Sequence, residues 1–191
     1  MARNGTGLIT AARWAEGTIY LGSFSKVLAP GLRLGYLVAP RALYPKLLQA
    51  KQAADLHTSG FNQRLVAEVL RDGFLDRHTP TIRARYRLQR DAMQAALQRS
   101  LPPGSEWQAP QGGMFFWLRL PEGCDAAELL DAAVARGIAY VPGAAFFAHA
   151  PDRRTLRLSF VTLSTQEIDD GVAVLGQVVR EHLDRLGELT P

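Results

Sequence analysis

Short apolar runs alternate with amphipathic stretches along the first third of this 191-residue chain. Thr18–Leu21 and Leu34–Val38 are compact and apolar, and Gly22 and Pro40 follow them, which predicts two strands. Leucines then recur at positions 43, 47 and 48, a spacing that predicts a helix. This order of strands and helices predicts an α/β or α+β architecture.

Two further helices are predicted before the middle of the chain. The first carries a cluster of apolar residues at positions 65, 66, 69 and 70 and is stopped by Gly73. The second begins at Thr79-Pro80, because a cap residue is followed by proline at the first helical position, and it runs to Pro102. Long helices of this kind often bridge two domains. We therefore expect one domain over residues 1–80 and another over residues 81–191.

The second half of the chain continues the alternation. Strands are predicted over Met114–Leu120, Ile138–Val141 and Leu156–Val161. Two helices with capping boxes are predicted as well, one from Asp125 to Arg136 with a stop at Gly137, and one beginning at Ser164 with Glu167 three residues on. The last helix has an apolar stripe at positions 168, 172, 175, 179 and 186.

Composition narrows the class of protein. With 47% hydrophobic and 21% charged residues the chain is typical of a globular protein. The net charge of +4 is scattered, and no apolar run approaches the roughly 18 residues that span a bilayer, so we expect neither nucleic acid nor membrane as a partner. Cys124 is the only cysteine, which favours a reducing compartment, the cytoplasm. The four histidines are dispersed, so no metal site is expected.

The stretch from Gly22 to Tyr36 holds the candidate chemistry. Lys26 lies between the two predicted strands, where α/β proteins commonly bind ligands. The Ser23 and Ser25 hydroxyls and the planar fork of Arg33 suit phosphate oxygens. No Asp or Glu occurs between residues 17 and 54, so a bound phosphate could balance the local positive charge. A neutral lysine amine can attack an aldehyde. The alternative is a surface lysine in a basic loop.

A second candidate is Arg157 in the last predicted strand. Alternation puts Leu156, Leu158 and Phe160 on one face and Arg157 with Ser159 on the other. An arginine in this position can orient a carboxylate through two parallel hydrogen bonds. The alternative is a solvated strand residue.

The motifs in these segments resemble those of one enzyme superfamily, in the same order. Ser-Phe-Ser-Lys at 23–26 with Leu-Ala-Pro-Gly-Leu-Arg-Leu-Gly-Tyr at 28–36 resembles the lysine loop of fold-type I pyridoxal-phosphate enzymes. Within them it looks like class I/II aminotransferases, especially the group of 2-aminoadipate and kynurenine aminotransferases, and a similar loop occurs in the aminotransferase-like domain of MocR-type regulators. Gly-Gly-Met-Phe at 112–115, Pro-Gly-x-x-Phe at 142–146 and Arg-Leu-Ser at 157–159 resemble further motifs of the family.

The resemblance implies a fold and a set of roles. It implies the C-terminal part of the large pyridoxal-phosphate-binding domain followed by a small α+β domain. Lys26 would bond covalently to the cofactor pyridoxal 5'-phosphate and move the substrate proton. Ser23, Ser25 and Arg33 would hold the phosphate, and Arg157 would hold the substrate α-carboxylate. The substrates would be an amino acid and a 2-oxo acid.

The resemblance covers only the second half of the family's pattern. No motif upstream of Lys26 matches the family's acid for the pyridine nitrogen or the aromatic residue stacked on the ring. We therefore expect a fragment or one part of a split enzyme, poorly active alone, that forms a homodimer or associates with the missing N-terminal half. A lyase or decarboxylase of the same fold, a ligand-sensing regulator domain and a remnant without function are the alternatives.

Overall fold

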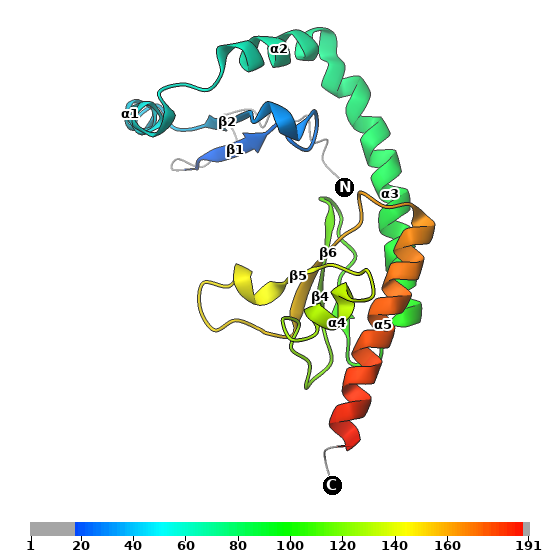
Figure 1. The fold of residues 1–191 in the computed structure, drawn as a ribbon. Coiled ribbons are helices and arrows are strands. Elements are labelled where there is room, and N and C mark those ends of the chain that lie inside the picture. The colour runs from blue at the N-terminus through cyan, green and yellow to red at the C-terminus, as the bar shows by residue number, and fades with distance from the viewer. Residues whose placement is uncertain (1–17, 189–191) are drawn as a thin grey trace. The chain divides into compact units, whose positions relative to one another are not determined.

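The computed structural model describes residues 18–188, and the chain divides into two compact units between Ile82 and Arg83. Each unit is described by itself: the N-terminal unit up to Ile82 and the C-terminal unit from Arg83 onward. The first seventeen residues of the predicted first domain lie outside the described range. Both units combine helices with strands, in agreement with the predicted fold class (Figure 1).

The N-terminal unit is built on a two-stranded antiparallel sheet. Strand β1 (Tyr20–Ser23) pairs with β2 (Gly35–Val38), so that Tyr20 lies opposite Val38 and Ser23 opposite Gly35. The first strand therefore begins two residues later than predicted and includes Gly22 and Ser23. The remaining elements are the 3₁₀ turn η2 (Pro30–Leu32), helices α1 (Tyr44–Asp55) and α2 (Gly60–Leu70), and the 3₁₀ turn η3 (Arg71–Gly73).

The C-terminal unit is built on a four-stranded sheet in the order β3-β4-β6-β5, and all neighbouring strands are antiparallel. Its strands are β3 (Glu106–Trp107), β4 (Phe115–Arg119), β5 (Val141–Pro142) and β6 (Thr155–Ser159). The short strand β3 was not predicted, and β5 is shorter than the predicted Ile138–Val141. Between the strands lie helix α4 (Leu130–Val134) and the 3₁₀ turn η4 (Gly143–Phe146).

Two long helices supply the core of the C-terminal unit, α3 (Phe74–Ser100), which begins in the N-terminal unit, and α5 (Thr165–Glu188). They lie side by side along the sheet in Figure 1. Alternate residues of β4 and β6 face this core, so Phe116, Leu118, Leu156 and Leu158 are buried while their neighbours lie on the other face. The predicted stripe of α5 is buried at Ile168, Val172, Leu175 and Val179.

The predicted start of the long helix was wrong. The structure begins α3 at Phe74, so Pro80 lies inside the helix rather than at its first position. The break comes earlier because Gly73 adopts a positive φ of 69° and Phe74 returns to helical angles. Thr81 donates its hydroxyl to the carbonyl of His78 at 2.7 Å, a local bond beside the proline, which has no N–H of its own to donate.

The two predicted capping boxes have different outcomes. The helix expected over Asp125–Arg136 is α-helical only over Leu130–Val134, because Asp125 accepts a hydrogen bond from the Ala127 N–H at 2.8 Å and holds a turn there. At the start of α5, the Ser164 N–H donates to Glu167 Oε2 at 2.7 Å, and the Glu167 N–H donates to Ser164 Oγ at 3.2 Å. This second capping box is confirmed.

Candidate cofactor and substrate sites

Lys26 lies in a single turn that begins directly after β1. The Leu28 N–H donates to the carbonyl of Phe24 at 2.9 Å, and the Phe24 N–H donates to the carbonyl of Leu34 at 3.1 Å. These bonds close the loop of residues 24–34 onto the start of β2, and we call this segment the lysine loop. The Lys26 side chain is exposed on this turn. The chain thus presents an accessible amine at the end of a strand.

The three predicted phosphate-binding residues also belong to this loop or border it. Ser23 Oγ accepts a hydrogen bond from the Ser25 N–H at 3.2 Å, so the two serines form a small polar turn beside Lys26. Arg33 has a positive φ of 53°, and its Nη1 donates to the carbonyl of Pro30 at 3.3 Å. Each of these residues thus has a local position fixed by backbone contacts, and the hydroxyl of the exposed Ser23 is open to a ligand.

Two contacts from outside hold the lysine loop in place. Asn62 Nδ2, on α2, donates to the carbonyl of Leu32 at 3.1 Å. The Tyr36 ring lies 5.4 Å from the Phe24 ring of the loop, centroid to centroid, and it also covers Gly22, where an added Cβ would lie 2.2 Å from Tyr36 Cζ unless the ring turned away. Neither contact could be predicted from the sequence, because the places of Asn62 and Tyr36 depend on packing between separate elements.

Arg157 lies on the face of β6 that points away from the core, as the alternation predicted. Its strand partners are Trp117 on β4 and Val141 on β5. Arg157 Cζ lies 4.2 Å from the centroid of the Phe115 ring and 4.7 Å from that of Phe146. The guanidinium is thus held against aromatic rings instead of extending into solvent, which the sequence did not predict.

The charge of Arg157 has no counter-ion within residues 18–188. Its Nε is buried and has no hydrogen-bond partner there. Two acids of the same unit are engaged elsewhere: Asp152 pairs with Arg119 at 2.7 Å, and Asp125 pairs with Arg153. Burial by itself would raise the pKa of Asp125, but the hydrogen bonds from Arg153 and from the Ala127 N–H outweigh it and lower the pKa. Arg157 therefore remains a cation available to an external anion.

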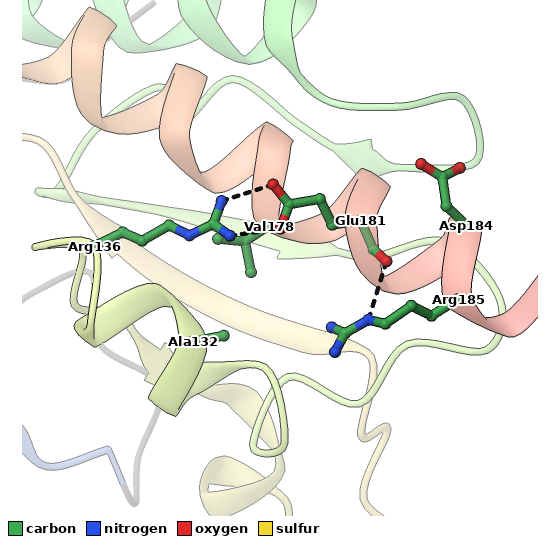
Figure 2. A pocket seen from close by; sticks show the side chains of 6 residues that line it. All are labelled: Ala132, Arg136, Val178, Glu181, Asp184 and Arg185. Carbon is green, nitrogen blue, oxygen red and sulfur yellow. Dashed lines mark hydrogen bonds and ion pairs between the residues drawn. The ribbon is translucent and has the colours of Figure 1, made fainter.

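A hollow of the described surface lies elsewhere, between α4 and α5. It has a volume of about 440 Å³, and Figure 2 shows the six side chains that line it, none of which was a predicted site residue. Arg136 donates to both carboxylate oxygens of Glu181, at 2.9 and 2.5 Å, and Arg185 Nε donates to the Glu181 carbonyl at 3.2 Å. The Arg136 guanidinium is thus paired with an acid of the chain itself, and none of the residues that line this hollow belongs to a motif of the sequence.

No group of His, Cys, Asp and Glu within residues 18–188 is arranged to hold a metal ion. None of the described helices is both long enough and apolar enough to cross a membrane.

Comparisons with known proteins identify the family. The model of aminotransferase class I and II matches residues 4–175, and the chain belongs to this family. Aromatic-amino-acid aminotransferase 1 of Thermococcus litoralis is 44% identical over 167 residues, which are 87% of this chain and 40% of that relative. The regulator TauR of Rhodobacter capsulatus, described as HTH-type, is 34% identical over 165 residues, 85% of this chain and 34% of its own length.

A solved structure supports the same fold. The α-aminoadipate aminotransferase LysN of Thermus thermophilus superposes with a TM-score of 0.83 at 46% identity, over 88% of this chain and 43% of that one. It was solved in complex with N-(5'-phosphopyridoxyl)-L-leucine. The predicted family is thereby confirmed. The chain spans 34% to 43% of the length of these three relatives.

Proposed function

We propose that this chain supplies the lysine and the carboxylate-binding arginine for pyridoxal-phosphate-dependent transamination between an amino acid and a 2-oxo acid. The observation that carries the proposal is the lysine loop. It presents an exposed amine and a serine pair at the end of β1, in a segment whose first acid is Asp55. The membership in an aminotransferase family supports the same reaction.

The residues present fit the cofactor. Ser23 and Ser25 offer hydroxyls to a phosphate, and Arg33 still has guanidinium N–H groups beyond the one donated to Pro30. When bound, pyridoxal phosphate supplies an aldehyde for covalent attachment and a ring that stabilises negative charge. Lys26 would bond to it and then carry a proton at the substrate Cα, and Arg157 would hold the substrate carboxylate.

The proposed partner is a polypeptide that covers the N-terminal unit, either a second copy or the equivalent of the relatives' remaining length. The described part of that unit exposes large apolar side chains on its strands and helices, and the most exposed are Leu21 at 74% and Phe61 at 76%. Exposed apolar patches of this kind mark interaction surfaces. Without this partner we expect the chain to catalyse transamination poorly, both in the cytoplasm, where we expect it to reside, and as a purified protein.

A second candidate function is ligand sensing as part of a regulator. The similarity to TauR favours it, since that relative is a transcriptional regulator by description. In a sensor, Lys26 would still bind the cofactor, but no 2-oxo acid would be released. Product analysis in the presence of an N-terminal partner separates the two functions, because only the transaminase forms a 2-oxo acid from the amino acid and an amino acid from the 2-oxo acid.

The direct test is chemical labelling of the amine. We expect pyridoxal phosphate followed by borohydride to leave a stable pyridoxyl group on the peptide that contains Lys26. Lys46 and Lys51 on α1 are internal controls, since they lie in the same unit outside the loop. Lys26→Arg should abolish the label and Arg33→Ala should reduce it. Equal labelling of Lys46 or Lys51, or labelling that persists in Lys26→Arg, would contradict the assignment.

A further inference from the structure

The outer face of the four-stranded sheet gathers aromatic side chains around Arg157. Phe115 comes from β4, where it lies opposite Ser159, two residues along from Arg157. Phe146 comes from η4, the turn that follows β5. The two rings thus reach the same guanidinium from different elements of the C-terminal unit.

The contacts are close enough to restrict the guanidinium. Arg157 Cζ lies over both rings, at 4.2 Å from the Phe115 centroid and 4.7 Å from the Phe146 centroid. Phe146 is itself held by Trp117, whose ring meets it at 5.6 Å and 75°, an edge-on contact. Arg157 Nε is buried, so within the described structure the terminal nitrogens Nη1 and Nη2 are the donors left for a ligand.

We propose that Phe115 and Phe146 are positioning residues that hold the Arg157 guanidinium ready for a carboxylate, an inference that rests on the proposed role of Arg157 in substrate binding. A ring lies against the face of a guanidinium, whereas its N–H groups point outward in its plane. The rings therefore fix the arginine without using the donors that a carboxylate needs. A neighbouring acid would fix it too, but a substrate would then have to displace that acid.

Phe147 provides a matched control. It follows Phe146 in the chain and also contacts Trp117, at 6.2 Å between ring centroids, but its ring does not lie under Arg157. Phe146→Leu and Phe147→Leu thus remove the same ring from neighbouring positions of one exposed turn. Phe146→Tyr keeps a ring in place and serves as the conservative variant.

The experiment uses the full chain labelled with ¹⁵N and follows the Arg157 side-chain resonances, assigned by comparison with Arg157→Gln. Ring currents should change the chemical shifts of the Arg157 side-chain protons from their usual values. Phe115→Leu and Phe146→Leu should each reverse part of this change. Glutarate is the probe, because it is a dicarboxylate with no keto or aldehyde group that could condense with the Lys26 amine. Each of the two variants should weaken its binding about fivefold, the share of one cation–π contact. Phe147→Leu and Phe146→Tyr should leave both readouts close to those of the original chain.

The outcomes separate this inference from the proposed function. If Arg157→Gln binds glutarate as the original chain does, the carboxylate role of Arg157 is wrong, and positioning for it is wrong too. If Arg157→Gln loses binding but Phe115→Leu and Phe146→Leu bind normally, only the positioning role is overturned. Should Phe115→Leu unfold the sheet, the comparison of Phe146→Leu with Phe146→Tyr decides alone, since Phe146 is 50% exposed and its loss leaves no buried cavity.

Discussion

The two units of this chain bury their apolar residues to very different degrees. In the C-terminal unit α3, α5 and the sheet enclose one continuous cluster that includes Leu97, Phe116 and Leu175. In the described part of the N-terminal unit, the buried hydrophobic residues are Leu34 and Val66. Both units have regular helices and strands, so the difference lies in packing and not in local structure.

This difference shows which part of the chain can stabilise itself. Burial of apolar surface is the main favourable term in folding, so a unit with a closed core has its own source of stability. A unit whose leucines and aromatic residues face outward gains that stability only when something covers them. We therefore expect the C-terminal unit to resist unfolding while the N-terminal unit opens easily, and three pairs of substitutions test this contrast.

The largest effect should come from the core. Phe116 is fully buried, at 0% exposed, and meets the Phe160 ring edge-on at 5.8 Å. Phe116→Ala should lower the free energy of unfolding of the C-terminal unit by about 3–5 kcal/mol. Leu65→Ala on the exposed part of α2 should change that of the N-terminal unit by less than about 0.5 kcal/mol. Amide hydrogen exchange, read separately for each unit, measures both values.

If Phe116→Ala and Leu65→Ala lowered the free energy of unfolding of their units equally, the proposed difference between the units would be wrong, because Leu65 would then be buried in solution. Such a result would point to a partner already bound to the N-terminal unit of the purified chain. The oligomeric state of the same sample, measured by ultracentrifugation, would then show whether that partner is a second copy.

An intermediate effect should come from two glycines that another group approaches closely. In α5, a Cβ added at Gly176 would lie 2.1 Å from the carbonyl oxygen of Ser100, at the end of α3. The Ser100 carbonyl is a backbone group and cannot move without shifting α3, so Gly176→Ala should lower the free energy of unfolding by about 1–3 kcal/mol. In the N-terminal unit, a Cβ at Gly22 would meet the Tyr36 ring, which is 45% exposed and can turn outward, so Gly22→Ala should cost less.

Thermal unfolding and hydrogen exchange check this pair, and Gly187→Ala is the control. Gly187 lies on the same helix with no atom near its Cβ position, so alanine there should be neutral or stabilising by up to about 1 kcal/mol. A larger cost at Gly22 than at Gly176 would show that the N-terminal unit is the more tightly packed of the two, contrary to the burial pattern.

The sequence predicted local features better than packing. The capping box at Ser164, the alternation around Arg157 and the position of the second strand follow from short-range patterns, and the structure has them. The start of α3 was misplaced because Thr79-Pro80 is a good cap signal that lost to a glycine turn six residues earlier.

The site shows the same division. Lys26, Ser23, Ser25 and Arg33 belong to one continuous segment, so their neighbourhood was readable from the chain. The aromatic rings around Arg157 were not, although Phe115 and Phe146 lie within motifs that the sequence displays. Their contact depends on the pairing of β4 and β5 with β6, and strand order is not encoded in any local pattern.

The smallest effect should come from two helix caps, one in each unit. Ser164 caps α5 within a reciprocal pair with Glu167, whereas Ser59 caps α2 by accepting only from the Asn62 N–H at 3.3 Å, and the first turn of α2 has no acid. Ser164→Ala should cost about 1 kcal/mol, and Ser59→Ala should cost less because α2 is held by fewer contacts.

The pH dependence of stability distinguishes the two caps more clearly than the alanine substitutions do. Hydrogen bonds from the Ser164 N–H and hydroxyl lower the pKa of Glu167, so its stabilising effect is complete above the ordinary carboxyl pKa and is lost as the pH falls through the lowered value. Glu167→Gln keeps an oxygen acceptor for the Ser164 N–H but removes the titration. Acid titrations followed by hydrogen exchange should therefore show a flatter pH dependence for the C-terminal unit in Glu167→Gln, while the α2 cap gives the same response in both chains. An unchanged acid response in Glu167→Gln would mean that other carboxylates, such as Asp125 with its lowered pKa, dominate the acid stability of this unit.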